Sequence, residues 1–168
     1  MSDADEAAFR AFAHTRRPAL RRTAYLMCGD WHQADDLVQT TLTKMYVAWR
    51  RVRTNEAPDA YARRVLTRCF LDERRRPWRR EWPVEAIDEQ AVTGAPADAS
   101  VLDLRAALAR LPRRQRATVV LRFWADASVT ETADALGCSE GTVKSQTARA
   151  INTLRSLLSD PVLVEETS

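Results

Sequence analysis

Apolar residues recur at helical spacing along almost the whole chain. Between residues 34 and 49 they fall at positions i, i+3, i+4, i+7 and i+8 over four turns, which predicts a long amphipathic helix. No segment alternates apolar and polar residues with a period of two, so we expect an all-α fold. Similar apolar stripes predict further helices at residues 9–27, 58–70, 101–111, 112–124, 130–136 and 140–158.

The helical periodicity is lost between residues 77 and 100. Pro77, Pro83 and Pro96 interrupt this segment, and its acidic residues outnumber its arginines. A stretch of about 20 residues without secondary structure is unusual inside one compact domain, although a poorly packed surface loop would have the same pattern. We therefore expect two small helical domains, 1–76 and 101–160, joined by a flexible acidic linker and followed by a tail at 161–168.

The distribution of charge predicts a polyanionic partner. The 168 residues carry a formal net charge of only +3. Residues 50–80, however, hold 11 arginines and 4 acidic residues, a net charge of +7, which leaves about −4 for the remainder. A local basic block in a nearly balanced protein indicates a specific surface for a polyanion.

Composition argues against several classes of function. The cysteines, Cys28, Cys69 and Cys138, are far apart, and there are only two histidines, a pattern unlike a disulfide framework or a zinc site. No apolar run reaches the roughly 18–20 residues of a membrane span, and the acidic N-terminus lacks a signal-peptide core. We expect a cytoplasmic protein that is not an enzyme and has no metal, cofactor, small-molecule ligand or membrane partner.

Residues 129–143 have the spacing of a helix-turn-helix. Ala133 is small where a second helix would cross, Gly137 tolerates positive φ in the turn, and Val143 would seal the second helix to the first. A plain helical hairpin with a glycine turn would share these features. Ser139 is well placed as the N-cap of the second helix. That helix would present side chains able to contact phosphates and base edges in a major groove, namely Glu140, Thr142, Lys144, Ser145, Gln146 and Arg149.

A second basic surface is predicted between residues 61 and 76, where arginines alternate with an apolar face. The planar guanidinium group suits phosphate, and aromatic residues beside a basic groove can stack on unpaired bases. The alternatives are a solvated face for the arginines and core or half-buried positions for Trp49 and Tyr61. The arginines are Arg63, Arg64, Arg68, Arg74, Arg75 and Arg76, and the flanking aromatic residues are Trp49, Tyr61, Trp78 and Trp82.

Two adjacent carboxylates, Asp35 and Asp36, lie near the start of a predicted helix. Such a pair could serve acid chemistry or bind a metal, but no histidine or second carboxylate cluster completes a site. Acidic side chains near a helix N-terminus are also stabilised by the helix dipole. We therefore expect a face that docks on another protein.

These motifs together resemble an extracytoplasmic-function sigma factor, in the short two-domain group of the sigma-70 family, and in particular its actinobacterial SigE-like subgroup. The likeness spans about residues 7–158, with the motifs in the family's order. The segments that carry it are 35–40, similar to the polymerase-binding region 2.2; 61–76, similar to regions 2.3 and 2.4; 111–123, similar to region 4.1; and 138–145, similar to the start of the region 4.2 recognition helix.

The resemblance implies a protein that links core RNA polymerase to promoter DNA. The first domain would bind the β′ clamp helices and read the −10 element while the strands separate. The second would contact the β flap and read the −35 duplex, and the linker would thread the polymerase cleft. An anti-sigma factor is a further partner that the family allows, and the polymerase itself performs the chemistry.

The resemblance also assigns residues to three surfaces. Core polymerase binding is assigned to Asp35, Asp36, Leu37, Gln39 and Thr40. Contact with the −10 element is assigned to Asn55, Tyr61, Arg63, Arg64, Arg68, Arg74, Arg75 and Arg76. Contact with the −35 element is assigned to Ser139, Thr142, Lys144, Ser145, Gln146 and Arg149. Two positions depart from many family members, which have Arg in place of Gln146 and Asn in place of Arg68; both affect the promoter sequence more than the class of protein.

Two other functions fit parts of the sequence. A stand-alone helix-turn-helix regulator with an N-terminal sensing or dimerisation domain would bind DNA tightly without polymerase. A nucleic-acid-processing enzyme would need a carboxylate or metal cluster, which the sequence does not offer.

The length of the linker adds an expectation about the free protein. A relaxed chain of about 22 residues spans roughly 26 Å, whereas promoter elements about 17 base pairs apart are separated by about 58 Å. In the absence of polymerase we therefore expect the two domains either to move independently or to pack together with their DNA-reading surfaces partly masked.

Overall fold

The computed structural model describes residues 1–73 and 99–159, apart from the side chains of residues 99–102. Every regular element in these ranges is an α-helix, as the periodicity predicts. The helices are α1 (Asp3–Cys28), α2 (Trp31–Asn55), α3 (Pro58–Asp72), α4 (Ala99–Arg110), α5 (Arg113–Phe123), α6 (Val129–Leu136) and α7 (Glu140–Ser159). The fourth helix begins at Ala99, so that it includes the last two residues of the predicted linker, and the other linker residues, 77–98, lie outside the described part of the chain.

Local sequence signals account for most helix boundaries. Gly29 ends α1 with a φ of 76°, a left-handed conformation that costs glycine little, and Asp30 then caps α2. Pro58 occupies the first turn of α3, where its missing N–H leaves no hydrogen bond unmade. Ser128 and Glu131 form a capping box that starts α6.

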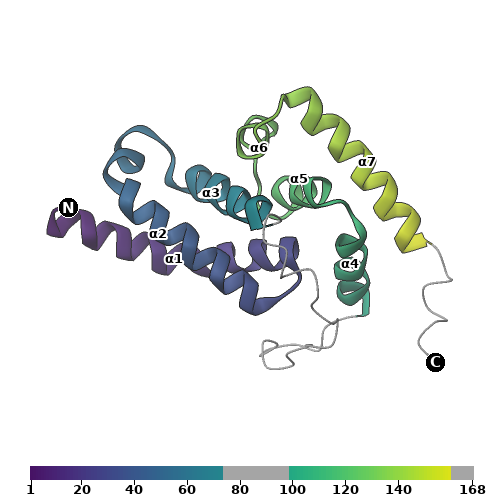
Figure 1. Cartoon of the computed structure of the whole chain (residues 1–168), viewed down its shortest axis with the longest axis horizontal. Coiled ribbons are helices and arrows are strands. Elements are labelled where there is room, and N and C mark those ends of the chain that lie inside the picture. Colours follow the sequence, from purple (N-terminus) through teal and green to yellow (C-terminus); the bar gives the residue numbers. More distant parts are fainter. Residues whose placement is uncertain (74–98, 160–168) are drawn as a thin grey trace.

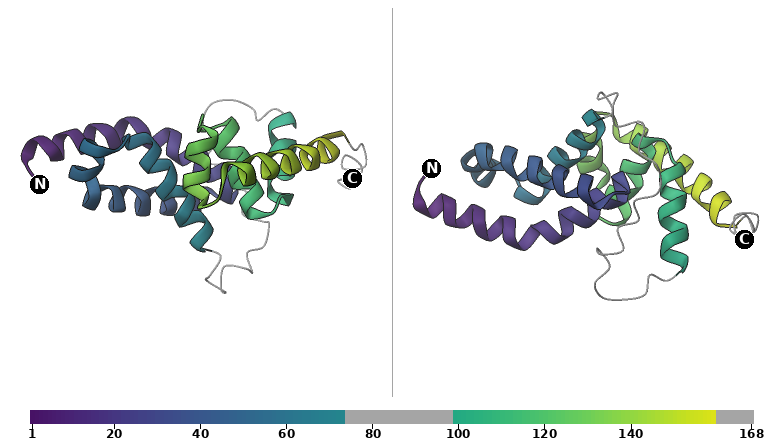
Figure 2. Two further views of the ribbon diagram at one scale, coloured as in Figure 1. Left: turned by 90° about the horizontal axis from the view of Figure 1, so that it is seen from above. Right: turned by 60° about the horizontal axis from the view of Figure 1, so that its bottom comes forward.

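The helices form two groups that lie side by side along an elongated molecule (Figure 1). Helices α1, α2 and α3 make up the N-terminal group, and α4 to α7 make up the C-terminal group. Helix α3 of the N-terminal group contacts both α5 and α6 of the other group (Figure 2), and α7 lies on the far side of the C-terminal group from α1 and α2 (Figure 1). The basic helix of the first half is thereby brought against the helix-turn-helix of the second.

The hydrophobic core does not divide where the two groups meet. Phe70 of α3 belongs to the same buried cluster as Leu37 of α2 and as Val120, Leu121 and Val143 from the second group. A smaller cluster joins α4, α5 and α7. Of the two arrangements expected for the free protein, the structure therefore has the packed one.

Arginines at the start of the second group also bind the ends of helices in the first. Arg105 donates to the Gly29 carbonyl at 3.2 Å, Arg116 donates to the Met27 carbonyl at 2.7 Å, and Arg113 donates to the Phe70 carbonyl. These carbonyls lie at the C-terminal ends of α1 and α3, where oxygens lack intrahelical partners and the helix dipole is negative. The second group thus caps two helices of the first.

Candidate nucleic-acid interface

Helices α6 and α7 form the helix-turn-helix that the spacing predicts. Gly137 adopts a φ of 65° between them, and Ala133 and Val143 are buried where the helices cross. Three polar side chains of α7, Lys144, Ser145 and Arg149, are exposed. The side of α7 that faces away from the core is therefore accessible in this structure.

Other predicted members of the recognition surface have local structural roles. The Ser139 hydroxyl accepts a hydrogen bond from the Thr142 backbone N–H at 3.1 Å and lies 2.9 Å from the Thr142 hydroxyl, so this pair caps α7. Gln146 is half-buried, and its amide oxygen is buried without a hydrogen-bond partner among the described residues. Ser139 is nevertheless exposed, whereas Thr142 and Gln146 are half-buried.

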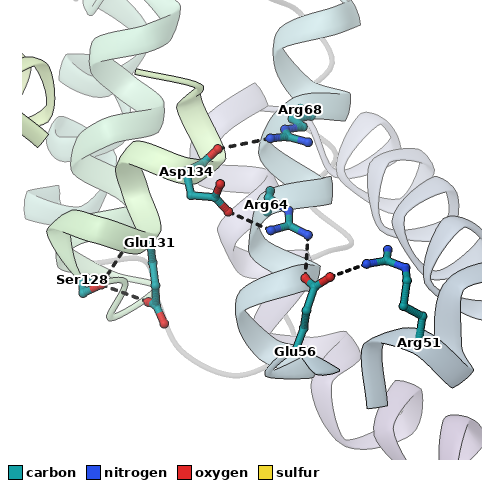
Figure 3. A network of polar contacts seen from close by, with 7 residues as sticks. All are labelled: Arg51, Glu56, Arg64, Arg68, Ser128, Glu131 and Asp134. Atoms are coloured by element: carbon teal, nitrogen blue, oxygen red, sulfur yellow. Dashed lines mark hydrogen bonds and ion pairs between the residues drawn. The ribbon is translucent and has the colours of Figure 1, made fainter. Parts of the chain in front are cut away.

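The arginines of α3 do not face solvent freely, because they contact α6. Arg63 donates to the Glu131 carboxylate at 3.1 Å, and Arg64 donates to the Asp134 carboxylate at 2.8 Å. Arg68, which is more exposed, donates to the Asp134 carbonyl at 3.3 Å (Figure 3). Three residues predicted to contact the −10 element are thus held by two acidic residues of the helix-turn-helix.

Arg64 is the centre of a wider polar network (Figure 3). Its second nitrogen donates to the Glu56 carboxylate at 2.7 Å, and Glu56 also pairs with Arg51. The hydrogen bond to Asp134, followed by the one to Glu56, raises the pKa of the Arg64 guanidinium despite partial burial. Burial acts to raise the pKa of Glu56, but its two arginine partners outweigh that effect and hold the pKa below its usual value.

Of the two aromatic residues that the structure describes, Trp49 is buried and Tyr61 is half-buried against the core. Trp49 is buried against Phe9 and Phe12, which confirms the core alternative for that side chain. Tyr61 is half-buried, and the guanidinium groups of Arg51 and Arg64 lie 5.5 and 4.9 Å from its ring centre. Asn55 is exposed at the end of α2, whereas Arg74, Arg75, Arg76, Trp78 and Trp82 lie outside the described residues.

A groove between α2 and the end of α3 holds the predicted polymerase-binding face. It has a volume of about 640 Å³, and Asp36, Gln39 and Thr40 line it with exposed side chains. Leu37 also borders it but is only 1% exposed, because its side chain packs in the core. Leu37 therefore supports the face from below instead of presenting a free side chain.

Asp35 differs from its neighbour Asp36 because it binds α1. Arg21 donates to both carboxylate oxygens, at 2.7 and 3.1 Å, and its guanidinium also stacks 4.3 Å from the centre of the Trp31 ring. The hydrogen bond from Arg21 lowers the pKa of Asp35. Asp35 thus fixes α2 against α1 and is not among the residues that line the groove.

We predict that Arg21→Gln raises the pKa of Asp35 toward its ordinary value. A depressed folded-state pKa adds stability above the unfolded-state pKa, and this stability is lost as pH falls through the folded-state value. The wild-type ion pair should therefore weaken only in acid, below the ordinary carboxyl pKa of 3.8. Carbon-13 NMR titration of the carboxyl groups in both proteins measures the shift, and an unchanged Asp35 titration would contradict it.

Within residues 1–73 and 99–159, no three His, Cys, Asp or Glu side chains gather in a way that could hold a metal ion. In the same ranges, no helix has both the length and the apolar character needed to cross a bilayer. Cys28 is largely enclosed, and burial raises the pKa of its thiol to about 12.

Sequence reasoning missed Glu131 and Asp134. Their i, i+3 spacing places both on the face of α6 that contacts the arginines of α3. The only signal for this contact is the charge complementarity of two segments about 70 residues apart. That signal does not distinguish these acids from the other acidic residues of the chain.

Comparison with known proteins identifies two sigma-factor regions in this chain. Residues 12–80 match the family model "Sigma-70 region 2", and residues 102–154 match "Sigma-70, region 4". The RNA polymerase sigma-E factor of Streptomyces coelicolor is 38% identical over 89% of this chain and 85% of its own. The ECF RNA polymerase sigma factor SigM of Mycobacterium tuberculosis is 32% identical over 92% of this chain and 79% of its own.

A solved structure has the same fold over most of its length. The sigma factor RpoE from Bartonella quintana, crystallised with the anti-sigma factor NepR, superposes with a TM-score of 0.73 at 28% identity, over 92% of this chain and 98% of that one. In this chain, the match to region 2 falls on the N-terminal helical group and the match to region 4 falls on the C-terminal group. The chain belongs to the sigma-70 family of RNA polymerase sigma factors, in its extracytoplasmic-function group.

Proposed function

We propose that this sigma factor binds core RNA polymerase in the cytoplasm and directs it to promoters through three separate surfaces. The groove between α2 and α3 contacts the β′ clamp helices, the arginines of α3 contact the −10 element, and the outer face of α7 contacts the −35 duplex. The chain catalyses nothing itself and needs no cofactor. The observation that carries the proposal is the exposed polar face of α7 on a helix-turn-helix with a left-handed glycine turn.

The three surfaces suit the partners assigned to them. Asp36, Gln39 and Thr40 present polar groups along an open groove, which fits a protein partner that supplies complementary charge. Lys144 and Arg149 supply cations for the phosphates on either side of a major groove. An anti-sigma factor is a further partner, a proposal supported by the structural relative crystallised with one.

Reconstitution with core polymerase tests the proposal. The holoenzyme should select fragments from a library of random DNA and give run-off transcripts of defined start from them, whereas core enzyme alone should not. A stand-alone regulator would instead select the same fragments tightly without polymerase. Tight selection by the free chain, with no stimulation of transcription, would replace our proposal with that alternative.

We predict that Lys144→Ala weakens binding of the free chain to DNA duplexes that contain the −35 element. The loss of affinity should be the same for duplexes of different base sequence. A lost phosphate contact should reduce the slope of log affinity against log salt by about 0.9. Lys44→Ala is the matched control. Lys44 is the only other lysine of the chain, and it lies on α2, outside the helix-turn-helix. Electrophoretic mobility shifts at three salt concentrations give both slopes, and equal slopes would remove Lys144 from the interface.

A base-reading contact has a different signature from a phosphate contact. Ser145→Ala is expected to cost about 1–3 kcal/mol at one base pair of the −35 element and little elsewhere. Binding to a set of single-base-pair variants measures this pattern. A uniform loss over all variants would make Ser145 a backbone contact instead.

A further inference from the structure

We propose that Glu140, the first residue of α7, selects cytosine at one base pair of the −35 element, and that Thr130 of α6 positions its carboxylate. The inference rests on the proposed function, specifically on α7 entering the major groove of the −35 duplex. The family resemblance does not assign Glu140 to that surface. Within α7 it is the one acidic residue, beside the cations Lys144, Arg149 and Arg155.

Glu140 lies at the end of α7 where a helix-turn-helix makes its base contacts. The N-terminal residues of a recognition helix reach the base edges, while the preceding helix crosses the DNA backbone. Glu140 directly follows Ser139, which caps α7, and it is exposed. Val143, by contrast, is buried where α7 crosses α6. The Glu140 carboxylate is therefore available to DNA and contributes nothing to the core.

A residue of the other helix orients this carboxylate. The Thr130 hydroxyl, on the first turn of α6, donates a hydrogen bond to Glu140 Oε1 at 2.7 Å. Holding one oxygen in place restricts a long side chain that otherwise samples several rotamers. An ionised carboxylate has about four lone-pair sites on its two oxygens, so a single hydrogen bond leaves acceptor capacity for a donor on DNA.

A carboxylate distinguishes the base edges of the major groove by the donors they carry. Cytosine presents its N4 amino group there, whereas guanine and thymine present acceptor atoms that an anion repels. Adenine presents its N6 amino group beside the N7 acceptor, so an acceptor-only side chain suits it less well than cytosine does. The pairing that Glu140 favours is therefore with cytosine N4.

The negative charge also disfavours sequences that lack this donor. DNA binding takes the carboxylate out of water and between two phosphate backbones, and an unpaired charge costs more to desolvate than a neutral side chain. Lys144 lies at position i+4 from Glu140 and offsets part of the repulsion. Glu140 should thus contribute more to discrimination between sequences than to affinity.

Holoenzyme reconstituted with core polymerase tests the inference on the promoter fragments that it selects. Competition binding compares fragments in which each base pair of the −35 element is replaced in turn by the other three. We expect the wild type to prefer cytosine at one position by about tenfold, as one good base contact provides. Glu140→Gln should lose this preference and favour adenine there, because an amide pairs with adenine N6 and N7. Preferences at the other positions should not change.

A second variant and a control separate the base contact from effects on folding and on net charge. Thr130→Val removes the hydroxyl but keeps the branched shape, and it should weaken the same cytosine preference about threefold, as expected for one lost hydrogen bond. Asp103→Asn removes one negative charge from an exposed position of α4, outside the helix-turn-helix, and should leave every base preference unchanged. Thermal melts followed by circular dichroism establish that each variant is folded.

Three results would overturn the inference with the proposed function left as it stands. A uniform gain of affinity for all fragments in Glu140→Gln would make Glu140 a repulsive charge without a base contact. An unchanged base preference would reduce the Thr130 hydrogen bond to a tie between two helices, and a Glu140-dependent preference for another base would refute the pairing with cytosine. A wild-type holoenzyme with no base preference in the −35 element, and unaffected by Lys144→Ala, would instead remove α7 from the groove, so that the proposed function would fail as well.

Discussion

Asp36→Arg combined with Gln39→Ala is expected to abolish co-purification of this sigma factor with core RNA polymerase. Both side chains are exposed in the groove between α2 and α3. Placing a cation where the proposed interface has an anion reverses the electrostatic complementarity, and like charges brought together at an interface cost several kcal/mol. We expect affinity for core enzyme to fall about 100-fold or more, which corresponds to about 2.7 kcal/mol.

The fold should survive this change, because neither side chain belongs to the buried core. Circular dichroism and the melting temperature should match the wild type, so that a lost complex reports the interface alone. Asp103→Arg makes the same charge change on the exposed side of α4 and is the control. Retained co-purification of the double variant would place the docking face elsewhere on the chain.

The helices could be predicted from the sequence because their ends depend on local chemistry. Gly29 and Gly137 supply positive φ at two helix ends, and Pro58 is confined to the first turn of the helix it begins. The apolar stripes then predict which residues are buried, and Leu37 is one of them. Leu37 belongs to the core and also lies beside the predicted docking face. Each of these signals acts within a few residues of the position it determines.

The contacts between the two helical groups could not be predicted in this way. Asp35 and Asp36 are adjacent in sequence, yet one binds Arg21 on α1 and the other lines the groove, because successive helix positions point about 100° apart. Arg113 and Arg116 belong to the segment that resembles region 4.1, and they cap helix ends of the other group across 43 and 89 residues of sequence. Such pairings depend on how whole helices pack, and no local pattern records them.

The continuity of the core across both groups leads to the prediction with the largest expected effect on stability. Phe70 is fully buried on α3, and the Arg113 guanidinium of α5 lies 4.1 Å from the centre of its ring. Phe70→Ala should lower the free energy of unfolding by about 3–5 kcal/mol, through lost burial and the cavity left behind. For a chain of this size that corresponds to a melting temperature about 6–20 °C lower.

Phe123→Ala is the matched control, because it deletes the same atoms from a side chain that is 54% exposed at the end of α5. It should change the free energy of unfolding by less than about 0.5 kcal/mol. Thermal melts followed by circular dichroism compare the two variants, and hydrogen exchange shows which helices open. Because the buried cluster of Phe70 includes Val120, Leu121 and Val143, α5 and α7 should lose protection together with α3. Protection of α5 and α7 that stays at the wild-type level in Phe70→Ala would show that the two groups unfold independently, and that the shared core contributes little to their association.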